Sequence, residues 1–245
     1  VSTPAPISTQ HVGIAEMDGD GEREAVAVDS RGSLYVLNPD GTPAWSAGAG
    51  NAFRNLNVPV ASYLLADVDA DNRTDLLVMT DDGDLFGYRG GSGSPMGTRG
   101  DGFLLKSDNP MPGVELWSFD LNPDAPGAHF GFGGASDEGL SRIGFYSVSL
   151  DGRVVLRGTA SLHGGAGQFP SVVVDVDDSG DLEMISSVRG GTELAPKGYV
   201  QLQTVGFIPG GFYLGGSYVN APLPDTVNYS APVVADLDRN GLKDA

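Results

Sequence analysis

The sequence of 245 residues contains no cysteine, which excludes disulfide bonds and thiolate metal sites. Basic residues are also scarce: 14 Lys and Arg stand against 32 Asp and Glu, and the formal net charge is −18. We expect no nucleic-acid partner, because no basic face is available to neutralise phosphates. No apolar run reaches the roughly 18 residues of a membrane-spanning helix, so we expect no membrane insertion.

Residues typical of catalytic sites are few and scattered. The three histidines, His11, His129 and His163, belong to no HExxH or HxH pattern, and we expect them on the surface or at strand edges. No G-x-S-x-G motif is present. Trp45 and Trp117 could line a sugar site, but both stand where a sheet core needs a large apolar residue. We therefore predict no catalytic residue.

Glycine and proline are abundant, with 37 and 16 residues, and apolar residues make up 40% of the chain. This composition predicts an all-β protein with many short strands, many turns and an adequate core.

Acidic loops recur along the chain, each after a stretch of alternating apolar residues. They start at residues 16, 67, 118, 175 and 236, which gives intervals of 51, 51, 57 and 61 residues. Four loops share one template: an oxygen-bearing side chain at positions 1, 3 and 5, Gly or Asn at position 6, and a carboxylate at position 9. A hard cation such as calcium requires this spacing of oxygen ligands. The predicted side-chain ligands are Glu16, Asp18, Asp20 and Glu24; Asp67, Asp69, Asp71 and Asp75; Asp175, Asp177, Ser179 and Glu183; and Asp236, Asp238, Asn240 and Asp244.

The loop that starts at Ser118 departs from the template. Its apolar Phe119 keeps the phase of the other loops, but Pro126 falls at position 9 and cannot be a side-chain ligand. If the loop instead starts at Asp120, with Asp120, Asn122 and Asp124 at positions 1, 3 and 5, Ala128 falls at position 9. We expect no cation of comparable occupancy in this loop.

A repeat of this length predicts a β-propeller of four-stranded blades. We assign residues 1–10 to a linker or edge segment and residues 11–245 to a partial propeller. In the first blade we expect Pro43-Ala-Trp45 as the fourth strand; in the second, a long surface loop over residues 89–102 replaces it. The last repeat stops at its first strand, so we expect a longer protein or a further subunit to complete the ring, and the start at Val1 suggests a mature or cut N-terminus. The predicted blades are 11–58, 59–112, 113–168, 169–229 and an incomplete 230–245.

These loops resemble the FG-GAP/VCBS repeats that also form integrin α-subunit propellers. The family signature, D-x-D-x-D-G-x-x-D between two apolar strands, is closely matched by Asp67 to Asp75 and Asp236 to Asp244. The resemblance implies a ring of about seven or eight blades with about four structural calcium ions. It also implies that position 7 binds the ion through its backbone carbonyl. Position 7 is occupied by Glu22, Arg73, Asp181 and Leu242.

The resemblance is specific for fold and cation and leaves three functions open. The leading hypothesis is a non-catalytic, calcium-stabilised module of a secreted or cell-surface protein that presents loops to a protein or glycan. Extracellular calcium, being millimolar, suits such a module. The alternatives are part of an extracellular polysaccharide lyase or hydrolase, and a structural subunit of an extracellular assembly or filament. Arg99-Gly100-Asp101 spells the tripeptide that integrins recognise, although such a tripeptide is also an ordinary solvated turn.

Overall fold

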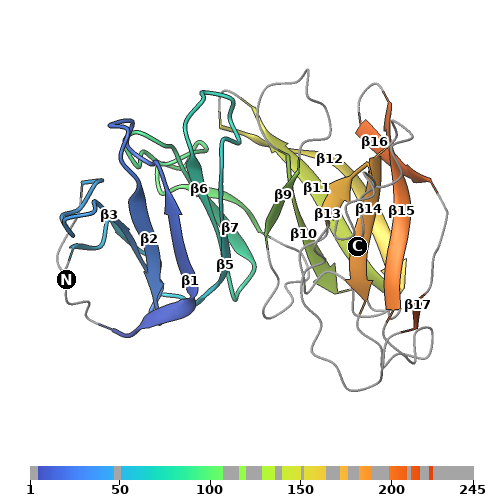
Figure 1. Ribbon diagram of the computed structural model, residues 1–245, viewed down its shortest axis with the longest axis horizontal. Helices are drawn as coiled ribbons and strands as arrows, with labels where there is room; N and C mark the ends of the chain where they lie inside the picture. Colours follow the sequence, from blue (N-terminus) through green and yellow to red (C-terminus); the bar gives the residue numbers. More distant parts are fainter. Residues whose placement is uncertain are drawn as a thin grey trace, which may run out of the picture. The chain divides into compact units, whose positions relative to one another are not determined.

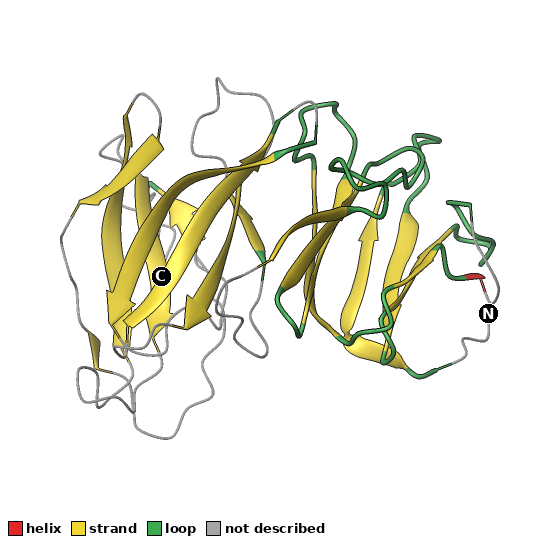
Figure 2. Cartoon of the chain, turned by 180° about the vertical axis from the view of Figure 1, so that it is seen from behind, coloured by secondary structure: helices red, strands yellow, loops and turns green. Residues whose placement is uncertain are grey.

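The described part of the chain folds into antiparallel β-sheets with almost no helix, as the sequence predicts (Figures 1 and 2). Within the part of the chain that is described, no helix is long and apolar enough to cross a bilayer. The computed structural model describes residues 5–46, 51–106, 116–119, 129–135, 140–149, 152–163, 172–175, 182–188, 199–208, 211–215 and 221–222. The chain divides into two units, the first comprising Val1–Leu116, Pro126–Ala128 and Ser147–Val155, and the second Trp117–Ala125, His129–Tyr146 and Leu156–Ala245.

The first unit contains two four-stranded sheets whose strands follow one another in chain order. Each strand pairs with the next in the sequence, so every connection is a hairpin or a longer loop. The first sheet is β1 (Ile7–Ala15), β2 (Glu24–Asp29), β3 (Ser33–Leu37) and β4 (Arg54–Asn55), and the second is β5 (Val60–Ala66), β6 (Asp75–Thr80), β7 (Asp84–Tyr88) and β8 (Phe103–Lys106).

A single apolar core joins these two sheets. In β2 the fully buried Val26 and Val28 alternate with half-buried alanines, so one face of the strand points into this core. In β6 all six residues are buried, because both faces of this central strand are covered. Burial of each large apolar side chain in such a core contributes roughly 1.5–3 kcal/mol. The cluster comprises Met17, Val26, Val28, Leu34, Val36, Trp45, Val60, Leu76, Val78 and Tyr88.

The connection over residues 89–102 covers the other face of the second sheet. Met96 is fully buried in it, and a Cβ added at Gly87 would lie 3.0 Å from the Met96 sulfur and 3.1 Å from Leu77. The Met96 amide donates to the Gly87 carbonyl at 2.8 Å. The predicted loop is therefore present, but it packs on the sheet, and the fourth strand that we expected it to replace follows it as β8.

The first sheet also differs from the prediction at its ends. Pro43 forms only an isolated bridge with Leu37, and the fourth strand is β4, some ten residues later in the chain. Trp45 is not in a strand; it is 2% exposed and belongs to the core. Strand β1 begins at Ile7, inside the segment assigned to a linker or edge, and forms the edge of its sheet.

The other two sheets repeat the same hairpin order; their strands belong to the second unit except for the segment Ser147–Val155, which belongs to the first. Trp117 is 4% exposed and meets Phe145 edge-to-face, with ring centroids 5.6 Å apart, so both tryptophans of the chain are core residues. His129 is buried in an interior strand, which corrects the expected surface or strand-edge role. The strands are β9 (Trp117–Phe119), β10 (His129–Ala135), β11 (Leu140–Val148) and β12 (Val154–His163) in one sheet, and β13 (Val172–Val174), β14 (Leu182–Val188), β15 (Tyr199–Ile208), β16 (Gly211–Gly215) and β17 (Ala221–Pro222) in the other.

Candidate metal sites

Three of the acidic loops connect strands that pair in the same register. The residue just before position 1 lies opposite the carboxylate residue at position 9: Ala15 opposite Glu24, Ala66 opposite Asp75, and Val174 opposite Glu183. The template residues between them therefore form the connection between the first two strands of each sheet. This strand–loop–strand frame is the one that the sequence predicts.

The first two loops, Glu16–Glu24 and Asp67–Asp75, also share one backbone conformation. Positive φ occurs at positions 4 and 6 of both: 89° at Gly19 and Gly21, 67° at Ala70 and 64° at Asn72. Glycine adopts this conformation without strain and asparagine tolerates it, whereas Ala70 adopts it at a cost. The apolar residue at position 2 is 1% exposed in each loop and anchors it to the core. Its amide donates to the position-9 carboxylate in each loop, Met17 to Glu24 at 2.5 Å and Val68 to Asp75 at 2.9 Å.

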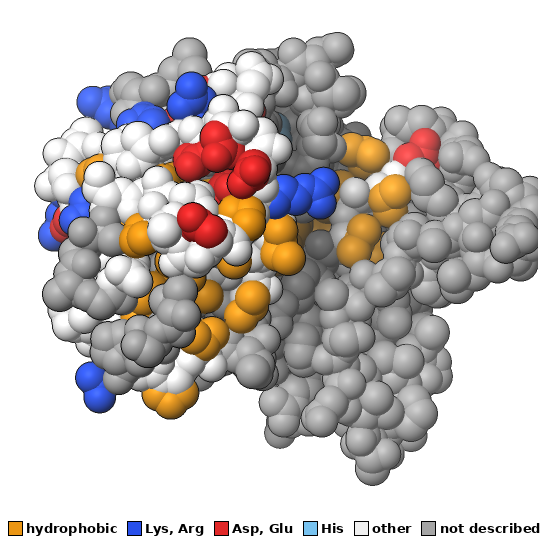
Figure 3. Space-filling view, turned by 60° about the vertical axis from the view of Figure 1, so that its left-hand side comes forward, with side chains coloured by type: hydrophobic (Ala, Val, Ile, Leu, Met, Phe, Trp, Pro, Cys, Tyr) orange, Lys and Arg blue, Asp and Glu red, His pale blue; other side chains and the backbone are white. Residues whose placement is uncertain are grey.

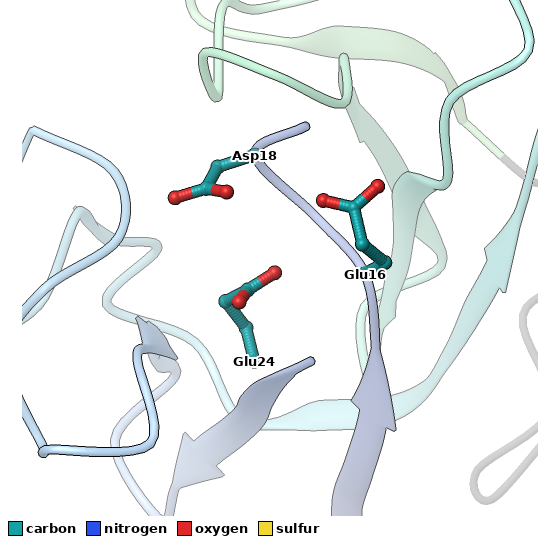
Figure 4. Close-up of side chains that lie close together, drawn as sticks. All are labelled: Glu16, Asp18 and Glu24. Atoms are coloured by element: carbon teal, nitrogen blue, oxygen red, sulfur yellow. The ribbon is translucent and has the colours of Figure 1, made fainter. Parts of the chain in front are cut away.

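In the first loop three carboxylates converge on one space. One oxygen from each of Glu16, Asp18 and Glu24 lies within 4.8 Å of the others (Figure 4). Glu24 begins β2 and is completely buried. Its Oε2 accepts the Met17 amide, whereas its buried Oε1 accepts no hydrogen bond from the described residues. A buried carboxylate oxygen without a donor is costly, so this arrangement suits a bound cation.

The electrostatics of Glu24 agree with that geometry. Burial raises the pKa of Glu24, and the hydrogen bond from Met17 opposes the shift. The neighbouring carboxylates Asp18, Asp20 and Glu16 raise the pKa further. A divalent cation in this space would reverse the repulsion that these like charges exert.

In the second loop the group that converges is Asp67, Asp69 and Asp71, again within 4.8 Å. Asp69 is 4% exposed; its Oδ2 pairs with Nε of Arg89 at 2.8 Å, and its buried Oδ1 accepts no hydrogen bond from the described residues. Asp67 accepts the amides of Asp71 at 3.2 Å and Asn72 at 2.9 Å. The second loop therefore holds an orphaned acidic oxygen too, but at position 3 instead of position 9.

Asp75 at position 9 is placed differently from Glu24. Its Oδ2 accepts the Val68 amide and its Oδ1 the Gly90 amide, both at 2.9 Å, so both oxygens face backbone donors. Burial raises the pKa of Asp75 to about 6, against the two amides, which lower it. The structure therefore does not bring Asp75 into the converging group. The side chain is one methylene shorter than that of Glu24, which keeps its oxygens near the backbone.

Three consecutive residues after β7 hold both loops in place. The Arg89 side chain pairs with Asp69, the Gly90 amide donates to Asp75, and the Gly91 amide donates to the Met17 carbonyl at 2.6 Å. A Cβ at Gly90 would lie 2.6 Å from the Thr74 carbonyl oxygen, so only glycine fits there. Sequence reasoning assigned this segment to a surface loop and missed it. The only signal was the run of glycines, which is typical of close backbone approach.

Acidic side chains of the first unit gather together on its surface (Figure 3). Of the remaining predicted ligands of these two loops, Asp20 lies outside the first converging group and accepts the Glu22 amide at 2.7 Å. The position-7 residue Arg73 donates its amide to Asp71 of the second group at 2.9 Å. In the third complete loop Asp175 is half-buried and Glu183 is buried at the start of β14. The other predicted ligands lie outside the described residues: Asp177, Ser179, Asp181, Asp236, Asp238, Asn240, Leu242 and Asp244.

The degenerate repeat does not keep the predicted phase. Ser118 and Phe119 lie in strand β9 instead of in a loop, and Phe119 pairs with His129 of β10. The connection is therefore residues 120–128, which is nearer to the alternative register that starts at Asp120. That connection, with Pro126 and Ala128, lies outside the described residues.

The Arg99-Gly100-Asp101 tripeptide forms an exposed turn in the 89–102 connection. Gly100 has a φ of 77°, and no atom lies within 4 Å of a Cβ added there. The Arg99 and Asp101 side chains face each other, with Nη2 and Oδ2 3.7 Å apart, and Asp101 also accepts the Phe103 amide at 3.0 Å.

No protein-family model matches this chain, and no curated protein matches it significantly.

Proposed function

We propose that this chain is part of a calcium-stabilised β-propeller, in which the acidic loops bind calcium and the longer connections present binding surfaces. The observation that carries the proposal is the completely buried Glu24 carboxylate, which has an oxygen within 4.8 Å of oxygens of Glu16 and Asp18 (Figure 4). Its Oε1 accepts no hydrogen bond from the described residues. Glu16, Asp18 and Glu24 would hold one ion and Asp67, Asp69 and Asp71 another. The ion supplies positive charge that neutralises each group and links the end of one strand to the start of the next.

The blade assignment is supported by the order of the strands and by the packing in the first unit. Each sheet begins with consecutive antiparallel hairpins, and the two sheets of the first unit share a face-to-face core. A propeller repeats this arrangement around an axis and so protects its sheet edges. The strand–loop–strand frame occurs at the same place in three sheets, which fits one repeated blade.

The proposed setting is the surface or exterior of a cell, and the proposed task is binding of a protein or glycan without catalysis. Open loops of a few carboxylates bind calcium weakly, and millimolar extracellular calcium would fill them. The 89–102 connection supports the binding task, because it is anchored to two cation loops and still exposes its Arg99–Asp101 turn.

Calcium titration of the full chain tests the proposal. Isothermal calorimetry of the metal-free protein should show calcium binding, and Asp18→Asn should remove one site, because it removes a charged ligand from the first group. Asp82→Asn is the matched control, since Asp82 is an exposed turn residue outside the loops. A chain without calcium binding, or equal stoichiometry in Asp18→Asn and the native protein, would refute the proposal.

A further inference from the structure

A cavity of about 440 Å³ lies in the first unit, between the 89–102 connection with β8 and the turn from β11 to β12. Its walls include Arg99, Phe103 and Leu104 on one side and Gly152, Arg153 and Val154 on the other. Its volume lies in the range of small-molecule sites, roughly 300–1,000 Å³. None of its described lining residues belongs to the acidic loops described above.

The charge of this cavity is opposite to that of the chain. Among its described lining residues, Arg99 and Arg153 are charged and none is Asp or Glu, in a protein with 32 acids and 14 bases. A third guanidinium lies beside it, since Nη2 of Arg89 is 3.1 Å from the position of a Cβ on Gly152. Guanidinium groups bind carboxylate, sulfate and phosphate through paired hydrogen bonds.

Two glycines let the walls of the cavity approach each other closely, and Arg99 already faces a carboxylate. Gly97 and Gly152 have φ values of 75° and 79°, and a Cβ on Gly152 would be 2.9 Å from the Gly97 amide nitrogen. The Asp101 carboxylate lies 3.7 Å from Arg99, and the two side chains are 50% and 60% exposed. Such an exposed pair contributes only about 0–1 kcal/mol, so an incoming anion displaces it at little cost.

The apolar part of the lining narrows the ligand class. Phe103, Leu104 and Val154 give the cavity an apolar wall beside its cationic groups. The Arg99 guanidinium lies 4.4 Å from the centre of the Phe103 ring, so a cationic group and an aromatic ring are adjacent in this cavity. A sugar ring offers an apolar C–H face together with hydroxyl groups, and an acidic sugar adds an anion.

We propose that this cavity, the Arg99–Arg153 cavity, binds an acidic saccharide, with the sugar ring on the apolar wall and its carboxylate or sulfate on the two arginines. The inference deepens the binding task of the proposed function, and it does not depend on calcium in the acidic loops. Calcium titration of the same protein tests that separate claim.

Calorimetry of the full chain in millimolar calcium tests the ligand class. The probes are a glucuronic acid disaccharide, a sulfated disaccharide, neutral cellobiose and a triglutamate peptide. The two acidic sugars distinguish carboxylate from sulfate as the anion. At least one of them should bind roughly tenfold or more tightly than cellobiose, as expected for a charge-assisted pair. Equal binding of cellobiose or triglutamate, or no binding of either acidic sugar, would overturn the proposal.

Variants test the residues. Arg99→Gln and Arg153→Gln should each weaken binding of the preferred acidic sugar about tenfold. Asp101→Asn should tighten it several-fold, because it removes the competing carboxylate and keeps an oxygen that can accept the Phe103 amide. Arg31→Gln is the matched control, an exposed arginine at the β2–β3 turn of the same unit, and should bind as the native chain does. Melting curves confirm that each variant is folded. Native affinity in both Arg99→Gln and Arg153→Gln would overturn the proposal.

Discussion

The first two acidic loops have the same backbone but neutralise their charge differently. In both, the position-2 amide donates to the position-9 carboxylate, and φ is positive at positions 4 and 6. In the first loop the second oxygen of Glu24 is buried and accepts no hydrogen bond within the described part of the chain, whereas in the second loop that of Asp75 accepts the Gly90 amide. In the second loop, Asp69 also forms an ion pair with Arg89. The second loop thus has partial internal compensation, so under the proposed function the first loop would depend more on a bound cation.

The largest effect should come from removing calcium. Each ion bound only to the native state adds about 2.7 kcal/mol at a hundredfold excess over its Kd, so two loops together contribute roughly 5 kcal/mol. Chelation should therefore lower the melting temperature considerably. Differential scanning calorimetry or circular dichroism measures this change. Identical melting curves in calcium and in chelator would contradict a structural role for either loop and remove the basis of the comparison.

The next effect concerns pH in the metal-free protein. Asp75 has a pKa of about 6 when folded against 3.8 as its ordinary value, so the unfolded chain releases this proton more readily. Stability from this group is therefore full below about pH 4 and is lost as the pH rises through 6, by up to about 3 kcal/mol. Urea unfolding of metal-free protein across this range measures it. Asp75→Asn should flatten this part of the profile; an unchanged profile in that variant would assign the pH dependence to other groups.

Removing the position-3 carboxylate of the second loop tests its internal compensation. Asp69→Ala should destabilise the calcium-loaded protein by about 1–3 kcal/mol, because it removes a ligand and leaves the half-buried Arg89 without its partner. Arg89→Met should destabilise the metal-free protein and affect the calcium-loaded one less. Chemical unfolding in the two states checks both variants. If Arg89→Met cost the same in both states, the idea that Arg89 substitutes for calcium would be wrong.

The smallest effect should distinguish the two position-9 residues. Glu24→Gln keeps the acceptor for the Met17 amide and places an amide where the orphaned oxygen was, so it should stabilise the metal-free protein by up to about 1 kcal/mol. Glu24→Gln should also reduce the stabilisation that calcium gives to the folded protein. Asp75→Asn should instead destabilise the metal-free protein at neutral pH or leave it unchanged, since its NH2 group would face a backbone donor. Urea unfolding midpoints with and without calcium measure the difference between the two substitutions. Equal shifts of the midpoint in Glu24→Gln and Asp75→Asn would contradict the proposed difference between the two loops.

Much of the fold could be predicted because periodicity and turn residues are local. Alternating apolar residues and the acidic template located the first two strands of the first, second and fourth sheets, and the Asp81-Asp-Gly83 turn joins β6 to β7 as such turns do. The prediction of the fourth strand was wrong in the first sheet, at Pro43–Trp45, and in the second sheet, at residues 89–102. Those strands are short, and their position depends on what the long connection packs against.

The sites could be predicted only as far as the spacing of carboxylates allows. The template located both converging groups, but not that Glu24 joins its group while Asp75 turns to the backbone. That difference depends on one methylene and on the Gly90 amide, which is distant in sequence. Arg89 was missed for the same reason, because its contact with Asp69 spans 20 residues.

Amide hydrogen exchange of the full chain, with calcium and with chelator, tests the central claim most directly. It reports each loop separately, through the Met17 amide in the first and the Val68 amide in the second. The account predicts that calcium increases protection in both loops, and more for Met17, whose acceptor Glu24 lacks the compensation that Asp75 has. Unchanged protection of both amides, or a larger gain at Val68 than at Met17, would contradict it.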